Sequence, residues 1–231
     1  FGSLLVGHLL YQGFEVFAID RLIHQGESLL GFLSHPKFRF ENVDLRQGFL
    51  SDDEEADFVV HLAALVGPVC DVDAGESWRT NHEVVGRVKD WVKSRKTTRM
   101  IFSSTCSNYG ITEGMATEST PLTPTSVYAE TKVAAEDVIA YLGDRGIVLR
   151  FGTLAGLSPR PRFDTLLNQW AYEGWSAGTI ECQQPEAWRP FIHVTDAVEA
   201  VIGLITDWPN NAPPCYNVVG FNTTKIDLAK E

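Results

Sequence analysis

Tyr128 and Lys132 have the residue types and the spacing to do chemistry together. They stand four positions apart in an alanine-rich helix candidate, 126–142, which has Thr125 or Ser126 as its cap. Residues at i and i+4 share one face of a helix, so the Lys132 ammonium can lie beside the phenol. Because a neighbouring cation lowers a tyrosine pKa, which is about 10 when unperturbed, Tyr128 is a candidate general base. The same spacing occurs by chance on many helices, so the pair needs partners elsewhere in the chain.

Hydroxyl side chains crowd the segment 103–110, Ser-Ser-Thr-Cys-Ser-Asn-Tyr-Gly, which follows an apolar strand candidate at 100–103. Uncommitted hydroxyls at a strand end can orient a substrate alcohol by hydrogen bonding. Ligands of doubly wound sheets bind at the carboxyl ends of the strands, so this position favours a site. A serine- and threonine-rich turn without a function is the alternative.

The elements that must position these residues alternate along the chain. Short β-branched and aromatic runs predict strands, and longer segments with helical periodicity separate them. The strand candidates are 14–20, 38–43, 58–62, 100–103 and 147–151, and the helix candidates include one from Leu4, 78–95 and 126–142. Strands that alternate with helices of this length predict an α/β fold with a doubly wound parallel sheet. We expect residues 1–150 to form this domain.

Residues 151–231 have a different composition, with many prolines among arginine, tryptophan and glycine. We expect a smaller α/β lobe there, with short strands and one helix at 163–175. A further helix candidate at 195–207 carries valine and isoleucine at helical spacing. We therefore expect the segment 190–207 to return to the main sheet.

Acidic and small residues follow the other strand candidates. Asp20 ends the first of them, 18 residues after Gly2. If Gly2 is the last glycine of a phosphate-binding turn, Asp20 stands where a carboxylate binds an adenosine ribose and repels a 2′-phosphate, which favours NAD over NADP. Asp44-Leu45 and Leu62-Ala63-Ala64 would form the walls of an adenine and pyrophosphate cleft. Ordinary turns are the alternative for each, and Arg21 could accommodate a phosphate.

Composition excludes several classes of protein. The 231 residues include 19 Lys+Arg and 30 Asp+Glu, a net charge of −11, so no broad basic face is available for nucleic acid or anionic lipid. No stretch approaches the roughly 18 apolar residues of a membrane span, and no signal peptide is evident. We expect a cytoplasmic protein without membrane or nucleic-acid partners. Four scattered cysteines with no C-x-x-C pair predict no metal site.

The order of these motifs resembles the extended short-chain dehydrogenase/reductase family, in particular its NAD-dependent nucleotide-sugar epimerase/dehydratase branch. The motifs are the Gly2 turn, Asp20, Asp44, His61-Leu-Ala-Ala, Asn81, Thr105 with Tyr109-Gly110, Tyr128-x-x-x-Lys132, 149–153, 189–196 and 216–220. The resemblance implies an NAD-binding Rossmann domain without its first strand and without the first two glycines of G-x-x-G-x-x-G. It also implies a substrate-binding lobe, 151–231, that is partly missing.

Family resemblance also implies which residues bind the cofactor. They are Gly2, Asp20, Asp44, Leu45, Leu62, Ala63, Ala64, Asn81, Ser103, Tyr128, Lys132 and Phe151. Thr105, Tyr128 and Lys132 would be catalytic. Thr105 would hydrogen-bond the sugar C4 hydroxyl of a nucleotide-diphosphate sugar while Tyr128 removes its proton and Lys132 holds the nicotinamide ribose. Hydride transfer to NAD would give a 4-keto sugar.

The residues after Thr105 bear on the fate of the oxidised sugar. Family dehydratases place Asp-Glu there and decarboxylases place Glu at the second position, whereas this chain has Cys106-Ser107. A reductase would need NADPH, against which Asp20 argues. Epimerisation needs no added acid, so we expect an NAD-dependent epimerase that acts through a transient 4-keto sugar. The alternatives are a 4,6-dehydratase, a decarboxylase, a reductase, or a non-catalytic dinucleotide-binding sensor or scaffold.

Cations must bind the diphosphate of such a substrate. The resemblance assigns Arg189 to this role, and Arg160 and Arg162 beside Asn168 are further candidates, with a solvated basic loop as the alternative. The predicted substrate-binding residues are Thr105, Tyr128, Thr153, Arg160, Arg162, Asn168 and Arg189. Members of the family commonly pair two helices, represented here by 78–95 and 126–142, so we expect a homodimer.

Overall fold

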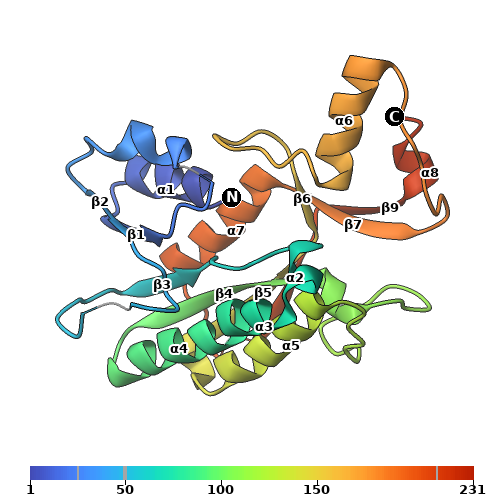
Figure 1. The fold of residues 1–231 in the computed structure, drawn as a ribbon. Helices are drawn as coiled ribbons and strands as arrows, with labels where there is room; N and C mark the ends of the chain where they lie inside the picture. Colours follow the sequence, from blue (N-terminus) through green and yellow to red (C-terminus); the bar gives the residue numbers. More distant parts are fainter. Residues whose placement is uncertain (25, 49–50, 212) are drawn as a thin grey trace.

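A four-stranded parallel sheet forms the centre of the protein in a computed structural model, which describes residues 1–24, 26–48, 51–211 and 213–231. Its strands, in spatial order, are β3 (Phe58–His61), β4 (Arg99–Thr105), β5 (Gly146–Phe151) and β8 (Cys215–Val218) (Figure 1). The register pairs His61 with Phe102 and Thr105 with Phe151. Because the strands are parallel, their carboxyl ends share one edge, where ligands of such sheets bind.

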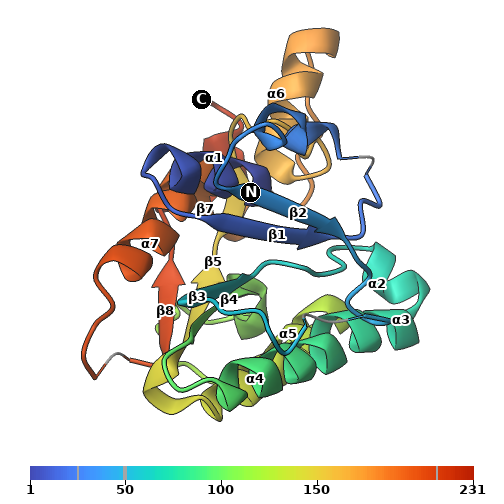
Figure 2. The same ribbon diagram turned by 90° about the vertical axis from the view of Figure 1, so that its left-hand side faces the viewer.

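A separate two-stranded parallel sheet pairs β1 (Val16–Asp20) with β2 (Phe38–Asn42), and the 3-10 helix η1 (Glu27–Phe32) lies between them in sequence (Figure 2). The expected single sheet is therefore in two parts, and no described residues join β1 to β3 by a strand ladder. Dinucleotide-binding sheets have the strand order 3-2-1-4-5-6. In that order β1 corresponds to strand 2, and β3 corresponds to strand 4. The described chain supplies no strand for the position between them.

Helices cover both faces of the four-stranded sheet, which confirms the predicted doubly wound α/β fold. On one face α1 (Gly2–Tyr11) and α7 (Val194–Thr206) pack around Ile101. On the other face α4 (Val84–Ser94) and α5 (Val127–Ala140) pack around Met100 and Phe102. This division follows from the strand period of two, which sends successive side chains of β4 to opposite faces. No helix in the described ranges is long and apolar enough to cross a membrane.

The segment after β3 differs from the single helix predicted at 78–95. It begins with α2 (Val69–Val72) and α3 (Ala74–Trp78), continues through a π-helical turn, Arg79–Glu83, and then becomes α4. Single π turns inside α-helices are frequent at functional sites. This one carries Asn81, which is buried.

The second lobe contains β6 (Thr153–Ala155), β7 (Trp188–His193), β9 (Phe221–Thr224), α6 (Leu166–Ala177) and α8 (Lys225–Leu228). β6 pairs with β7 in parallel, and β9 pairs with β7 antiparallel. The two lobes meet at Gly152, where a Cβ atom would lie only 3.1 Å from the Pro190 carbonyl carbon. α6 begins later than predicted because Thr165 has an extended backbone. The short 3-10 helices η3 (Cys106–Tyr109) and η4 (Gly143–Arg145) complete the elements.

Candidate active site

Lys132 is buried on the face of α5 that packs against the end of β4. Its side chain is 2% exposed, and Nζ donates a hydrogen bond to the Ser103 carbonyl at 2.7 Å. The ammonium lies 6.0 Å from the ring centroid of Tyr128 and 4.6 Å from that of Phe102. Burial lowers the pKa of Lys132 to about 8, although the Glu136 carboxylate opposes the shift. The predicted i,i+4 arrangement therefore brings cation and phenol to one face.

Thr105, the last residue of β4, adjoins the phenol of Tyr128. The Thr105 hydroxyl accepts a hydrogen bond from the Ser107 backbone N–H at 3.1 Å, and its side-chain hydrogen bond with Tyr128 lowers the pKa of that phenol. Burial has the larger and opposite effect, so the pKa of Tyr128 is raised to about 12. This differs from the lowered pKa expected from the Lys132 spacing, because desolvation disfavours phenolate. The charge of Arg162 also acts on the phenol and lowers its pKa.

Asn81 holds the loop that follows β3. Its side chain is 1% exposed, accepts a hydrogen bond from the Leu65 backbone N–H at 2.8 Å and donates to the Leu65 carbonyl at 2.9 Å. It also donates to the Thr131 hydroxyl on α5 at 3.1 Å. Its polar atoms are thus satisfied within the protein. The predicted contribution of Asn81 to cofactor binding stays a prediction, and we expect it to act through the loop that carries Ala63 and Ala64.

Gly2 and Leu62 lie together at the amino end of α1. A Cβ built on Gly2 would meet the Leu62 side chain at 3.5 Å, an ordinary contact. The backbone N–H groups of a first helical turn have no partners within the helix, and the helix dipole adds positive potential there. Arg160 and Arg162 lie near enough for their charges to act on the Phe1 amino group. This end of α1 therefore suits a pyrophosphate.

The two predicted acids at the strand ends differ in availability. Asp20 is exposed, and its Oδ1 accepts a hydrogen bond from the Leu22 N–H at 2.7 Å. Asp44 instead forms an ion pair with Arg46, whose hydrogen bonds hold the pKa of that carboxyl well below its usual range. Arg21 approaches the same carboxylate at 3.6 Å. Asp20 is therefore accessible to a ribose, whereas Asp44 is engaged by Arg46.

The other predicted cofactor-binding residues contribute a backbone atom to the site or pack in the core. Leu45 packs against the cluster between the sheet and α4. Phe151 is buried, and its ring meets that of Phe1 edge-on, with 5.3 Å between centroids. Ser103 contributes its carbonyl to Lys132. A cofactor at this edge of the sheet would thus meet main-chain atoms and apolar side chains here.

The predicted substrate residues divide into two groups. Arg162 lies 4.0 Å from a Cβ built on Gly67, and its charge acts on Tyr128. Its guanidinium pairs with Asp164 at 2.6 Å. Asn168 holds the same loop, because its Oδ1 accepts from the Gly156 N–H and its Nδ2 donates to the Arg162 carbonyl, both at 3.0 Å. The second group lies outside this cluster. Thr153 is half-buried on β6, Arg160 is exposed, and Arg189 is exposed on β7.

Cys106 occupies the position where family dehydratases place an acid. Its thiol is half-buried, and its Sγ donates to the Arg150 carbonyl at 3.3 Å. Burial raises the pKa of this thiol to about 12. Ser107 comes next and is exposed. This pair offers no acid and base for elimination of water.

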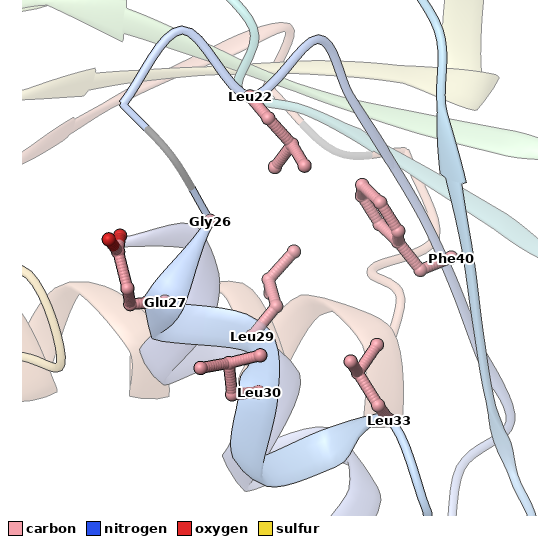
Figure 3. Close-up of a pocket in the computed structure, with 7 residues that line it drawn as sticks. All are labelled: Leu22, Gly26, Glu27, Leu29, Leu30, Leu33 and Phe40. Atoms are coloured by element: carbon pink, nitrogen blue, oxygen red, sulfur yellow. The ribbon is translucent and has the colours of Figure 1, made fainter.

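An apolar pocket of about 190 Å³ lies away from these residues, between η1 and β2. Figure 3 shows leucine side chains and Phe40 facing one another there, with the Glu27 carboxylate turned away. The described residues of its lining include no cation. They therefore offer no charged partner to a phosphate.

Glu136 and Arg150, which the sequence patterns did not single out, form a buried ion pair behind Thr105. A signal was present in the sequence. Glu136 stands four residues after Lys132, on the helix face that also carries the apolar residues Ala135 and Ile139. A carboxylate at such a position needs a partner.

Comparisons with known proteins identify the family and the fold of the chain. The model of the NAD dependent epimerase/dehydratase family matches residues 1–218. A UDP-glucose 4-epimerase from Lactobacillus helveticus is 29% identical over 68% of this chain and 49% of its own length, so the chain spans about half of that relative. The fold matches UDP-glucuronic acid 4-epimerase from Bacillus cereus, with TM-score 0.84, 21% identity, and coverage of 98% of this chain and 76% of the other. It also matches dTDP-glucose 4,6-dehydratase from Bacillus anthracis, with TM-score 0.82, 20% identity and coverage of 99% and 75%. The chain belongs to the NAD dependent epimerase/dehydratase family.

Proposed function

We propose that the protein is an NAD-dependent epimerase of a nucleotide-diphosphate sugar. The observation that carries the proposal is the arrangement of Thr105 against Tyr128, with Lys132 buried beside both and only Cys106-Ser107 after the threonine. Oxidation and reduction of a sugar carbon need the first three residues. Dehydration needs an additional acid and base, which the turn lacks.

NAD is the cofactor of this family, and the residues present fit it. An ammonium has three donors, and among described residues Lys132 uses one, to Ser103, which leaves two for ribose hydroxyls. The amino end of α1 suits the pyrophosphate, and Asp20 suits the adenosine ribose. When bound, NAD would supply the acceptor for hydride from the sugar carbon, the donor that returns it, and a positive charge.

Tyr128 accepts the proton of the sugar hydroxyl in this proposal. Its pKa of about 12 means that the phenol is protonated at neutral pH even with Arg162 and Lys132 beside it. The positive charge that NAD would add lowers this pKa further in the proposal. Thr105 keeps the substrate hydroxyl in line with the phenol, because the Ser107 N–H already fixes one lone pair of the Thr105 oxygen.

Arginines bind the diphosphate in this proposal. Arg162 is nearest to Tyr128, and Arg160 shares its loop. Arg189 approaches from β7, at the point where the two lobes meet. We place the substrate between this loop and the edge of the sheet. We also propose a homodimer, with the layer of α4 and α5 as its interface.

Proton NMR of sugar conversion tests the function. The full-length protein with NAD is incubated with UDP-glucose, UDP-galactose, UDP-glucuronic acid and dTDP-glucose. We expect interconversion of one pair of C4 epimers, with no net formation of NADH. Tyr128→Phe should lose at least about 100-fold in kcat, as expected for loss of a general base, whereas Tyr141→Phe, an exposed tyrosine at the end of the same helix, should retain activity.

Three results would overturn the proposal. Accumulation of a 4-keto-6-deoxy sugar indicates a dehydratase, and release of CO2 from UDP-glucuronic acid indicates a decarboxylase. Full activity of Tyr128→Phe removes the proposed base.

A further inference from the structure

A buried ion pair lies behind the turn that carries Thr105. Arg150 on β5 and Glu136 on α5 are 6% and 8% exposed. Arg150 Nη2 donates to Glu136 Oε2 at 2.6 Å, and Arg150 Nε donates to both carboxylate oxygens at 3.1 Å. Burial of two charges is unfavourable unless hydrogen bonds satisfy them, so the pair must be well held. Its members are not among the residues that contact the proposed substrate.

The same carboxylate also holds the strand and the turn on either side of Thr105. Glu136 Oε1 accepts hydrogen bonds from the Ser104 hydroxyl at 2.5 Å and from Asn108 Nδ2 at 2.7 Å. Asn108 Nδ2 also donates to Ser104 Oγ at 3.1 Å, whereas Asn108 Oδ1 has no partner among the described residues. The anion therefore fixes the orientation of the amide. Rotation of that amide would turn its oxygen toward the carboxylate.

Arg150 ties down the far end of the turn. Its Nη1 donates to the Tyr109 hydroxyl at 2.8 Å, and that hydroxyl donates to Asn217 Oδ1 on β8 at 2.7 Å. The ion pair thus holds residues 104, 108 and 109, and Thr105 lies between them. A catalytic hydroxyl displaced by about 1 Å can lose on the order of 100-fold in rate.

We propose that Glu136 is a positioning residue: its carboxylate sets the Thr105 turn against Tyr128. This inference rests on the proposed function. Glu136 stands one helical turn after Lys132, and its charge raises the pKa of that amine against the effect of burial. The other titratable groups near Lys132 are Tyr128, His61 on β3 and Cys70 on α2.

Glu136→Gln removes the charge and nearly preserves the shape. The carboxylate receives only donors, from Arg150, Ser104 and Asn108. A glutamine that keeps its oxygen toward Ser104 and Asn108 presents its NH2 group to the Arg150 guanidinium. Two donors then face each other, so the hydrogen bond from Arg150 Nη2 to this side chain is lost. Asp137→Asn is the matched control, because Asp137 is the next residue of α5 and is exposed.

Steady-state kinetics on the full-length protein, with the nucleotide sugar that it converts, test the inference. We expect Glu136→Gln to lower kcat about 10- to 100-fold, with KM and the Kd of NAD within about twofold of the parent. Asp137→Asn should match the parent. Retention of kcat within about twofold, or a loss expressed wholly in KM, overturns the inference. If Glu136→Gln does not fold, Ser104→Ala, which removes one contact of the carboxylate, should still lower kcat at unchanged KM, and an unchanged kcat is the contrary result.

A second readout does not depend on turnover. NMR titration of the Lys132 amine, assigned with Lys132→Arg, should give a lower pKa in Glu136→Gln than in the parent and no change in Asp137→Asn. An unchanged pKa overturns the inference that the charge of Glu136 acts on Lys132. If the parent converts no nucleotide sugar, the proposed function fails, and the titration still decides whether the charge of Glu136 acts on Lys132.

Discussion

Asn81→Ala should destabilise the protein and weaken NAD binding, because Asn81 joins the loop after β3 to α5. The substitution removes two half-buried hydrogen bonds, to the Leu65 N–H and the Leu65 carbonyl, and a buried one to the Thr131 hydroxyl. Each contributes about 1 kcal/mol net, and the two backbone groups of Leu65 lose their partner at a half-buried position. We therefore expect a loss of about 3 kcal/mol, or about 6–12 °C in Tm for a chain of this length.

Urea and thermal unfolding followed by circular dichroism measure the loss, and calorimetry measures NAD affinity. Asn222→Ala is the control, because Asn222 is exposed on β9, and its effect should stay within about 0.5 kcal/mol. A loss below about 1 kcal/mol for Asn81→Ala, with unchanged NAD affinity, would refute the view that this side chain holds the loop.

Two further perturbations test the backbone and the pH response. Gly110→Ala should be strongly destabilising, by more than about 3 kcal/mol, because φ is +64° and the new Cβ would lie 2.0 Å from the Thr123 carbonyl oxygen. Gly143→Ala should cost only about 1 kcal/mol, since φ is +58° and nothing lies within 4 Å, and equal losses in urea unfolding would contradict the argument. Burial lowers the pKa of His61 from 6.5 to about 3, so the unfolded chain binds the extra proton between these values. Stability should fall as pH drops through this range, by up to about 1.4 kcal/mol per pH unit from this group, and His61→Gln should reduce that slope in urea titrations at several pH values.

Local sequence patterns were sufficient for several elements and for the shared face of Tyr128 and Lys132. The apolar spacing within 126–142 and 195–207 specifies helices with one buried face, and α5 and α7 follow it. Tyr128 and Lys132 share a face because helical geometry alone relates residues four positions apart. β4 continues to Thr105, two residues beyond the strand predicted at 100–103.

Contacts between residues far apart in the sequence required the tertiary structure. The π turn at Arg79–Glu83 turns Asn81 toward Thr131, which is 50 residues away, and no local period indicates it. The approach of Arg21 to the Asp44 carboxylate likewise depends on the pairing of β1 with β2.

The sequence by itself determined an α/β chain with a tyrosine, a lysine and a threonine at strand and helix positions suited to redox chemistry on an alcohol. Only the tertiary structure decided the electrostatic state of that site. Burial raises the pKa of Tyr128 and lowers that of Lys132, and Glu136 and Arg150 pair from different elements behind Thr105. The physical reason is that spacing along a helix is a local property, whereas desolvation depends on every element that packs around a group.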